Sequence, residues 1–301
     1  MRERVLKYSR DTMLFNIIAY FSIAALAFLC LLPFLLVISG SVTEESSIIL
    51  YGYRLIPVKI SLAAYKIAFG NPTTILRAYA VTAFVTATGT LLSLFLTSMA
   101  SYALQRKDFV YRNIFAFFFY FTTIFSGGLV PWYILMVKYL HMKDSYLALI
   151  IPGLFGMFNM IIIRSFMSSI PDSITESAKI DGASDFRIFI QLILPLSKPV
   201  LVAIGLFIAL EYWNDWYLSM LFIQKEKMYP LQYFLYKIIS KIDFLKNVAA
   251  KSSNINLSKI SLPSESFKLA MTVIATGPII FLYPYLQKYF IKGIMMGAVK
   301  G

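Results

Sequence analysis

The most regular feature of the sequence is a set of six long apolar stretches separated by polar connections. A helix needs about 20 apolar residues to cross a hydrocarbon core about 30 Å thick, and its backbone polar groups must be satisfied within the segment. Only two charged residues, Glu211 and Asp215, fall inside the stretches. The pattern therefore predicts an all-α membrane protein with six transmembrane helices. The predicted spans are residues 13–38, 78–105, 113–137, 145–163, 199–224 and 269–287.

Composition agrees with this prediction. Of the 301 residues, 59% are hydrophobic and 14% are charged, whereas soluble domains carry about 25% charged residues. A soluble fold of this size would lack the polar side chains needed to cover its surface. The chain holds one Cys and one His, which excludes an internal disulfide framework and metal sites built from several Cys or His ligands. We therefore expect no metal site.

The distribution of Lys and Arg residues gives only a weak signal for the orientation of the chain in the membrane. An even number of spans places both termini on one side, and half of the 28 Lys and Arg residues fall on each side. The net charge of +13 therefore does not indicate nucleic acid as a partner. The positive-inside rule weights the first helix and short loops, so the basic N-terminus and the loop 106–112 favour cytoplasmic termini.

This topology divides the chain into a multi-pass domain with two large connections. The predicted parts are a cytoplasmic N-terminus (1–12), a transmembrane domain (13–291) and a cytoplasmic tail (292–301), with a long inner connection at 170–198 and a long outer one at 225–268.

The long inner connection predicts a short helix that ends in a sharp turn. Ser173 and Glu176 have the spacing of a capping box, so a helix is expected to begin at Asp172 or Ser173. Gly182 can adopt the left-handed conformation that ends such a helix.

A second short helix should follow the turn. Ser184 or Asp185 can cap its start, and Pro195 lies at its end. The physics leaves two interpretations open: Glu176 caps only its own helix within an amphipathic segment lying on the bilayer, or the two helices form a rigid surface for a partner.

At this point the sequence resembles a known family. The inner connection looks like the EAA loop of the permease subunits of binding-protein-dependent ABC importers, with Ser177 and Leu192 at positions where Ala and Ile are usual. The resemblance rests on Glu176-Ser177-Ala178, then Gly182, then Leu192-Ile193-Leu194-Pro195, and on Asp181-Gly182-Ala183 for the carbohydrate-uptake branch.

The resemblance extends over nearly the whole chain. Within the family, the chain is similar to maltose-permease-like proteins, in particular to the LplC-type oligosaccharide and polysaccharide branch. The further matching stretches are 125–131, 159–166, Trp213-Asn214-Asp215-Trp216 and the C-terminal stretch 283–301.

The resemblance implies a type I ABC importer permease fold and a set of partners. These are a second, non-identical permease subunit, a cytoplasmic ABC ATPase dimer, an extracytoplasmic sugar-binding protein and an oligosaccharide, all at the bacterial plasma membrane. ATP and Mg²⁺ would bind the ATPase, and this chain would hold no cofactor. The implied ATPase-coupling residues are Glu176, Ser177, Ala178, Asp181, Gly182, Ala183, Leu194 and Pro195, and the implied ATPase-contacting tail residues are Lys292, Gly293 and Lys300.

The chain is not expected to be an enzyme. It contains no G-x-x-x-x-G-K-[ST] loop for nucleotide phosphates, no H-E-x-x-H and no G-x-S-x-G. ATP hydrolysis is therefore expected in a separate subunit.

The fifth span carries the strongest candidates for a substrate path. Glu211 lies at its centre and Asp215 one helical turn further out, and intramembrane acids indicate a functional site by default. Aromatic faces and polar groups beside them suit sugars. The candidates are Glu211, Trp213, Asn214 and Asp215, with Asn159 in the fourth span.

Each candidate has a structural alternative. Asp215 and the Trp residues can be interfacial belt residues, Glu211 can form a buried ion pair with another subunit, and Asn159 can make an interhelical hydrogen bond. Glycine and proline also interrupt the third span at Gly127, Gly128 and Pro131, which indicates a cavity lining, a hinge or a kink.

The outer connection predicts an amphipathic helix, because apolar residues recur there at helical spacing. It either covers the bundle or lipid, or it forms a platform for the sugar-binding protein. The apolar positions are Leu231, Phe234, Leu235, Ile238, Ile239, Ile242 and Leu245.

The sequence thus favours an ATP-driven importer for oligosaccharides or polysaccharide fragments, uronate-containing ones among them. One rival is an ion-coupled secondary transporter that uses Glu211 and Asp215; it predicts inverted repeats, and the sequence shows no convincing one. Another rival is a membrane enzyme, for which the same two acids are the candidate catalytic groups.

Overall fold

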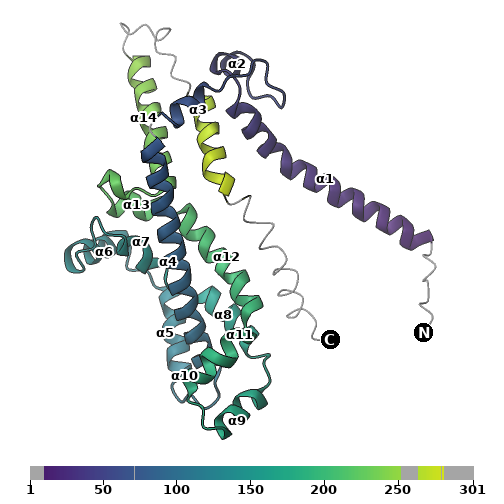
Figure 1. The fold of residues 1–301 in the computed structure, drawn as a ribbon, viewed down its shortest axis with the longest axis vertical. Coiled ribbons are helices and arrows are strands. Elements are labelled where there is room, and N and C mark those ends of the chain that lie inside the picture. The colour runs from purple at the N-terminus through teal and green to yellow at the C-terminus, as the bar shows by residue number, and fades with distance from the viewer. Residues whose placement is uncertain (1–9, 71, 252–263, 279, 281–301) are drawn as a thin grey trace. The chain divides into compact units, whose positions relative to one another are not determined.

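The computed structural model describes residues 10–70, 72–251, 264–278 and 280. The regular secondary structure in these ranges is helical, and their one β-type pairing is an isolated bridge between Thr43 and Ile60. The chain divides into two units, unit 1 (Met1–Asn71 and Ile242–Thr276) and unit 2 (Pro72–Lys241 and Gly277–Gly301), whose helices are labelled in Figure 1.

The described part of unit 1 starts with a long apolar helix. Helix α1 (Arg10–Ser41) covers the first predicted span, and large apolar side chains along it are exposed, as expected of a helix that meets lipid or another subunit. Helices α2 (Glu45–Tyr51) and α3 (Ala63–Ala68) follow. A further helix begins at residue 265 and covers the start of the sixth predicted span, most of whose remainder lies outside the described residues.

The carboxylate of Glu45 caps this last helix. It accepts hydrogen bonds from the backbone N–H groups of Glu265 and Ser266 at 2.9 Å and from the hydroxyls of Ser264 and Ser266 at 2.9 Å. A carboxylate is favoured there because the helix N-terminus presents free N–H groups and a partial positive charge. Burial by itself raises the pKa of the Glu45 carboxyl group. The four hydrogen bonds together lower it by more, so the pKa of Glu45 lies below the ordinary value.

Unit 2 is built on helix α4 (Pro72–Gln105), which packs against α8 (Met157–Met167) and α12 (Lys198–Asn214). With 34 residues, α4 is about 50 Å long. Small side chains recur on it at four-residue intervals, and all of them are buried. They are Gly89, Ser93, Thr97 and Ser101. Such a stripe lets helix backbones approach closely within a membrane.

The aromatic ring of Tyr212 on α12 fills the space that two glycines leave. A Cβ atom at Gly89 would lie 2.5 Å from the ring carbon Cζ of Tyr212, and one at Gly153 would lie 2.8 Å from its hydroxyl oxygen. That hydroxyl donates to the carbonyl of Ile150 at 2.7 Å. The ring therefore locks α12 against α4 and against the 3₁₀ turn Ile151–Gly153.

The third predicted span is not one helix. It consists of α5 (Arg112–Ile124), α6 (Leu129–Ile134) and the π-helix Leu135–Tyr139, and the chain bends by 111° between α5 and the rest. The break occurs where Gly128 adopts a φ of +88°, next to the glycines and proline that mark it in the sequence.

The fourth and fifth predicted spans are also interrupted. Helix α7 (Leu147–Ile150) with its 3₁₀ turn meets α8 at 51°. Helix α12 ends at Asn214, Asp215 has an extended backbone, and α13 (Tyr217–Phe222) follows; the 3₁₀ turn Glu226–Met228 leads on to α14.

Among the described residues, two helices are long and apolar enough to cross a membrane unbroken, namely Thr12–Ser41 and Pro72–Gln105. Counting each sharply bent pair of helices as one span raises the number to five. The six-span topology therefore stays a prediction.

The predicted amphipathic outer helix is α14 (Leu231–Lys251). Its first turn is attached to α4, because the backbone N–H of Leu231 donates to the hydroxyl of Thr82 at 2.7 Å. Leu231 and Leu235 are buried, so the first turns of α14 cover the helices of unit 2, as one of the two interpretations expects.

We expect Gly89→Ala to lower the stability of the folded chain by about 1–3 kcal/mol, because the new methyl group collides with Tyr212 in a closely packed site. The measurement is the apparent melting temperature of the purified, detergent-solubilised protein. Gly127→Ala is the matched control, since no atom lies within 4 Å of a Cβ placed there. Equal melting temperatures for the two variants would contradict the proposed packing.

We expect Glu45→Gln to destabilise the protein at pH 7 by about 1–2 kcal/mol, because a charged acceptor is lost from a helix N-terminus. The folded-state pKa of Glu45 is lowered, so its contribution is present above the unfolded-state pKa of about 4.3 and is lost as the pH falls through the folded-state pKa. The difference in melting temperature between variant and parent should therefore shrink below pH 4. Glu44→Gln is the control, since Glu44 pairs with the exposed Lys59 and should matter little.

Candidate coupling loop and translocation groove

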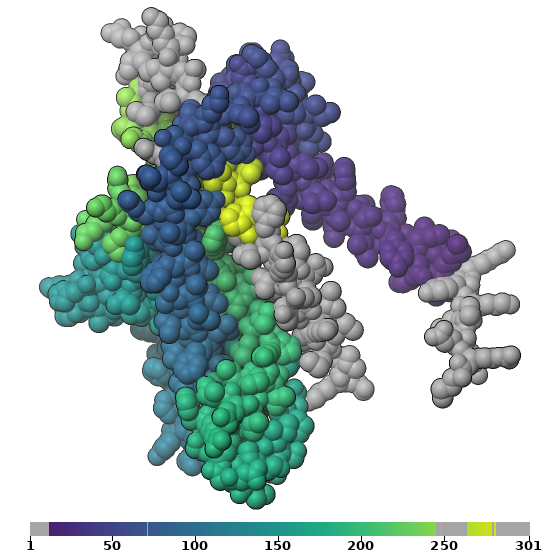
Figure 2. Space-filling view, viewed as in Figure 1, coloured from purple at the N-terminus to yellow at the C-terminus, as the bar shows by residue number. Residues whose placement is uncertain are grey.

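The inner connection, residues 170–198, is called the coupling loop below. It consists of α9 (Asp172–Ile180), α10 (Asp185–Ile188), the π-helix Phe189–Ile193 and α11 (Leu194–Leu196). Figure 1 places α9 and α10 at one end of unit 2, and Figure 2 shows the green atoms of this region on the surface there.

The turn between α9 and α10 has the geometry that the sequence predicts. Gly182 has a φ of +79°, the backbone N–H of Gly182 bonds to the carbonyl of Lys179, and that of Ala183 bonds to the carbonyl of Ala178. This is the Schellman pattern of helix endings. The hydroxyl of Ser184 accepts from the N–H of Arg187 at 3.4 Å and caps α10.

The predicted capping box is wrong. Helix α9 begins at Asp172 after Pro171, and no side chain caps it. Ser173 therefore lies within the first turn instead of before it, and Glu176 does not cap its own helix.

The coupling residues divide between an exposed and a packed face. Ala178, Ala183 and Leu194 pack against the hydrophobic core of unit 2. The outer face is open and carries both charged and apolar groups. It includes Glu176, Ser177, Asp181, Gly182, Pro195 and Ile180, whose surface is 86% exposed.

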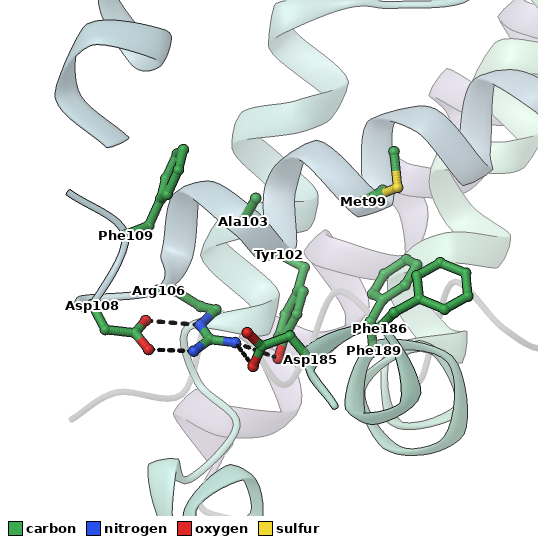
Figure 3. Close-up of a pocket in the computed structure, with 9 residues that line it drawn as sticks. All are labelled: Met99, Tyr102, Ala103, Arg106, Asp108, Phe109, Asp185, Phe186 and Phe189. Carbon is green, nitrogen blue, oxygen red and sulfur yellow. Dashed lines mark hydrogen bonds and ion pairs between the residues drawn. The ribbon is translucent and has the colours of Figure 1, made fainter. Parts of the chain in front are cut away.

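A groove of about 350 Å³ separates the end of α4 from α10, and the side chain of Arg106 crosses it (Figure 3). The Arg106 guanidinium bonds to the carboxylates of Asp108 and Asp185 and lies 5.8 Å from the ring centre of Tyr102. The ammonium of Lys179 lies 2.9 Å from the Asp108 carboxylate. Hydrogen bonds from Arg106 and Lys179 hold the pKa of Asp108 well below its ordinary value.

The sequence pattern gives no functional signal at Arg106 or Asp108. Their charges follow an apolar span, where basic residues are expected for topology alone. Only the tertiary fold brings them to Lys179 and Asp185, more than 70 positions further along the chain.

A second groove, of about 530 Å³, lies between α8 and α12. It brings together three of the predicted path residues, Asn159, Glu211 and Asn214, beside apolar side chains. Glu211 is exposed and forms no ion pair within the described part of the chain. The complete lining is Phe158, Asn159, Phe207, Leu210, Glu211 and Asn214.

Asp215 and Trp213 do not line this groove. The sequence places Asp215 one helical turn beyond Glu211, but α12 ends before it, and its carboxylate accepts the N–H of Leu218 at 3.2 Å at the start of α13. The Trp213 ring packs near Tyr79, with ring centres 6.4 Å apart. Both side chains therefore contribute to the packing of unit 2.

The remaining predictions about sites concern the tail and metals. Lys292, Gly293 and Lys300 lie outside the described residues. Within the residues that the structure describes, no group of three or more His, Cys, Asp and Glu side chains is placed to hold a metal ion.

The sequence matches a known protein family over most of its length. Residues 12–296 match the family described as binding-protein-dependent transport system inner membrane component. The polygalacturonan/rhamnogalacturonan transport system permease protein YtcP of Bacillus subtilis is 38% identical over 96% of this chain and 99% of its own length. Protein LplC of the same organism is 39% identical over 90% of each chain.

A solved structure is similar as well. A crystal structure of a bacterial ABC transporter involved in the import of the acidic polysaccharide alginate contains a chain that matches with a TM-score of 0.77 and 29% identity, over 94% of this chain and 99% of that one. The chain therefore belongs to the family of binding-protein-dependent transport system inner membrane components, as a membrane permease of the sugar ABC transporter type.

Proposed function

We propose that this chain is one permease subunit of an ATP-driven importer for oligosaccharides or polysaccharide fragments, and that its coupling loop docks on a cytoplasmic ATPase. The observation that carries the proposal is the open outer face of α9. Glu176 and Asp181 are exposed there beside Ile180, an apolar side chain with 86% of its surface exposed. Exposed apolar and charged groups on a well-anchored helix suit a protein partner.

Family membership supports the remaining partners that we propose. A transport system that depends on a binding protein needs an extracytoplasmic sugar-binding protein, and an ABC importer needs an ATPase dimer. A second, non-identical permease would complete the path across the membrane. Docking of the coupling loop on the ATPase would put the basic loop 106–112 and both termini in the cytoplasm, the orientation that the positive-inside rule favours.

The groove between α8 and α12 is the proposed contribution of this chain to the cargo path. Its carboxylate and two amide groups can bind hydroxyl groups, and Phe158 and Phe207 offer apolar faces for the C–H faces of sugar rings. The relatives named for polygalacturonan and for alginate transport support a polysaccharide fragment as cargo.

The alternative of an ion-coupled secondary transporter is less well supported. It requires Glu211 and Asp215 to act together, but Glu211 lines the groove while the Asp215 carboxylate binds the backbone of α13. Family membership also favours ATP as the source of energy.

We expect Glu176→Lys to release the ATPase and to abolish uptake, because it reverses a charge on the docking face. The measurements are co-purification of the ATPase with the permease complex and ATP-dependent uptake into proteoliposomes of labelled galacturonan, rhamnogalacturonan, alginate and arabinan oligosaccharides. Glu226→Lys is the control, since Glu226 is an exposed acid outside the coupling loop. Uptake that continues without ATPase subunits and collapses with the ion gradient would overturn the proposal.

We expect Glu211→Gln to lower the ratio of neutral to uronate oligosaccharide uptake by about tenfold. A carboxylate attracts hydroxyl donors and repels uronate, and a hydrogen bond to a charged group contributes about 1.5–3 kcal/mol. The competing uptake of arabinan and galacturonan fragments in one vesicle preparation measures this ratio. An unchanged ratio in a fully assembled variant would exclude Glu211 from the cargo path.

A further inference from the structure

We propose that Arg106 and Asp108 form a permanent clasp that joins the coupling loop to the end of α4, so that the two move as one rigid body when the ATPase acts. The inference rests on the proposed docking of the coupling loop and adds to it the route by which motion enters the membrane helices. We call the two ion pairs Arg106–Asp185 and Asp108–Lys179 the clasp.

Three consecutive residues after α4 reach three separate points of the coupling loop. Lys107 pairs with Asp172 at the first residue of α9, with 2.9 Å between its ammonium and the carboxylate. Asp108 pairs with Lys179 near the last residue of α9, also at 2.9 Å.

Arg106 provides the third point of contact. Its guanidinium pairs with Asp185 at the first residue of α10 (Figure 3). The clasp therefore holds the end of α9 and the start of α10, on either side of the turn at Gly182.

Arg106 is better placed than an ordinary surface charge to hold this geometry. Only 14% of its side chain is exposed, and its guanidinium lies beside the Tyr102 ring while bonding to two carboxylates. Two guanidinium N–H groups reach the two oxygens of Asp108, which fixes their relative orientation. Ion pairs held in a network of this kind are more rigid than isolated pairs.

Aromatic packing beneath the clasp also joins α4 to the coupling loop. The rings of Tyr102 on α4 and Phe189 in the π-helix of the coupling loop stack with their centres 5.5 Å apart. Phe189 and Ile193 are buried. A push on α9 therefore reaches α4 through two kinds of contact, charged at the surface and aromatic beneath it.

The pairs differ in exposure, and this difference provides an internal control. In the pair Lys107–Asp172 the side chains are 82% and 62% exposed, so solvent screens it strongly. We infer that Arg106 and Asp108 are the positioning residues, and that the pair Lys107–Asp172 contributes little.

The test uses the assembled importer with a reversible cross-link. The chain has a single cysteine, Cys30, so a Cys30→Ser parent is free of thiols in this subunit. In this parent, Asp108→Cys with Lys179→Cys removes one ion pair of the clasp. A short bifunctional thiol reagent then replaces it with a covalent link that a reductant can cleave.

The readout is the number of sugar molecules imported per ATP hydrolysed, with the oligosaccharide that the parent imports fastest. We expect this ratio to fall about tenfold in the double-cysteine variant, while the ATPase still co-purifies and hydrolyses ATP. The cross-link should restore the ratio to within about twofold of the parent, and the reductant should lower it again.

Three results would overturn the clasp. The first is an unchanged ratio before cross-linking. The second is a loss of uptake on cross-linking, which would show that the two segments must separate. The third is a parallel loss of assembly and ATP hydrolysis, which would show a merely structural role. Asp108→Asn is a milder variant in case the double variant does not assemble, with Asp172→Asn as its matched control, and only the former should lower the ratio.

Hydrogen exchange tests the clasp without relying on transport, and so separates it from the proposed function. Hydrogen exchange of the α9 backbone amides should be about tenfold faster in Asp108→Asn than in Asp172→Asn, even in a complex that imports none of the sugars. Equal exchange rates would overturn the clasp. Failure of the parent to import any sugar with ATP would instead count against the proposed function alone.

Discussion

The close packing of α4 is the constraint on which the rest of unit 2 depends. Small buried side chains at four-residue intervals let α8 and α12 approach its backbone, and the Tyr212 ring occupies the space left by Gly89 and Gly153. In a bilayer, apolar burial alone does not drive helices together, because lipid tails are as apolar as leucine. Close van der Waals contact and specific hydrogen bonds, such as that of Tyr212 with Ile150, must supply the specificity.

Contacts near the two ends of α4 position other parts of unit 2. Near one end, Thr82 accepts the first free N–H of α14 and so positions the amphipathic outer helix. After the other end, Arg106 and Asp108 contact the coupling loop. The groove that holds Asn159 and Glu211 lies between α8 and α12, the two helices that pack on α4 between these ends. A single helix thus positions the outer helix, the proposed cargo groove and the coupling loop.

Sequence patterns predicted the local features well. Gly182 turns the coupling loop because only a residue without a Cβ takes a φ of +79° at little cost, and Ser184 caps α10. The start of α9 at Asp172 agrees with the prediction, but the capping box failed because Pro171, and not Ser173, stands at the N-cap position. The i+4 relation of Glu211 and Asp215 failed because α12 ends between them. Both errors concern the residue at which a helix begins or ends, which local sequence determines weakly.

The sequence by itself determined the apolar segments, the class of protein and the family, because these depend on composition and on the spacing of a few residues along the chain. It also determined the position of the turn in the coupling loop, since the backbone there requires glycine. Only the tertiary structure decided which charges meet. Arg106 and Asp185 are 79 positions apart, and no periodic pattern relates them, because their distance in space depends on how α4, α8 and α12 pack. The same packing separates Glu211, which lines a groove, from Asp215, whose carboxylate accepts the backbone N–H of Leu218.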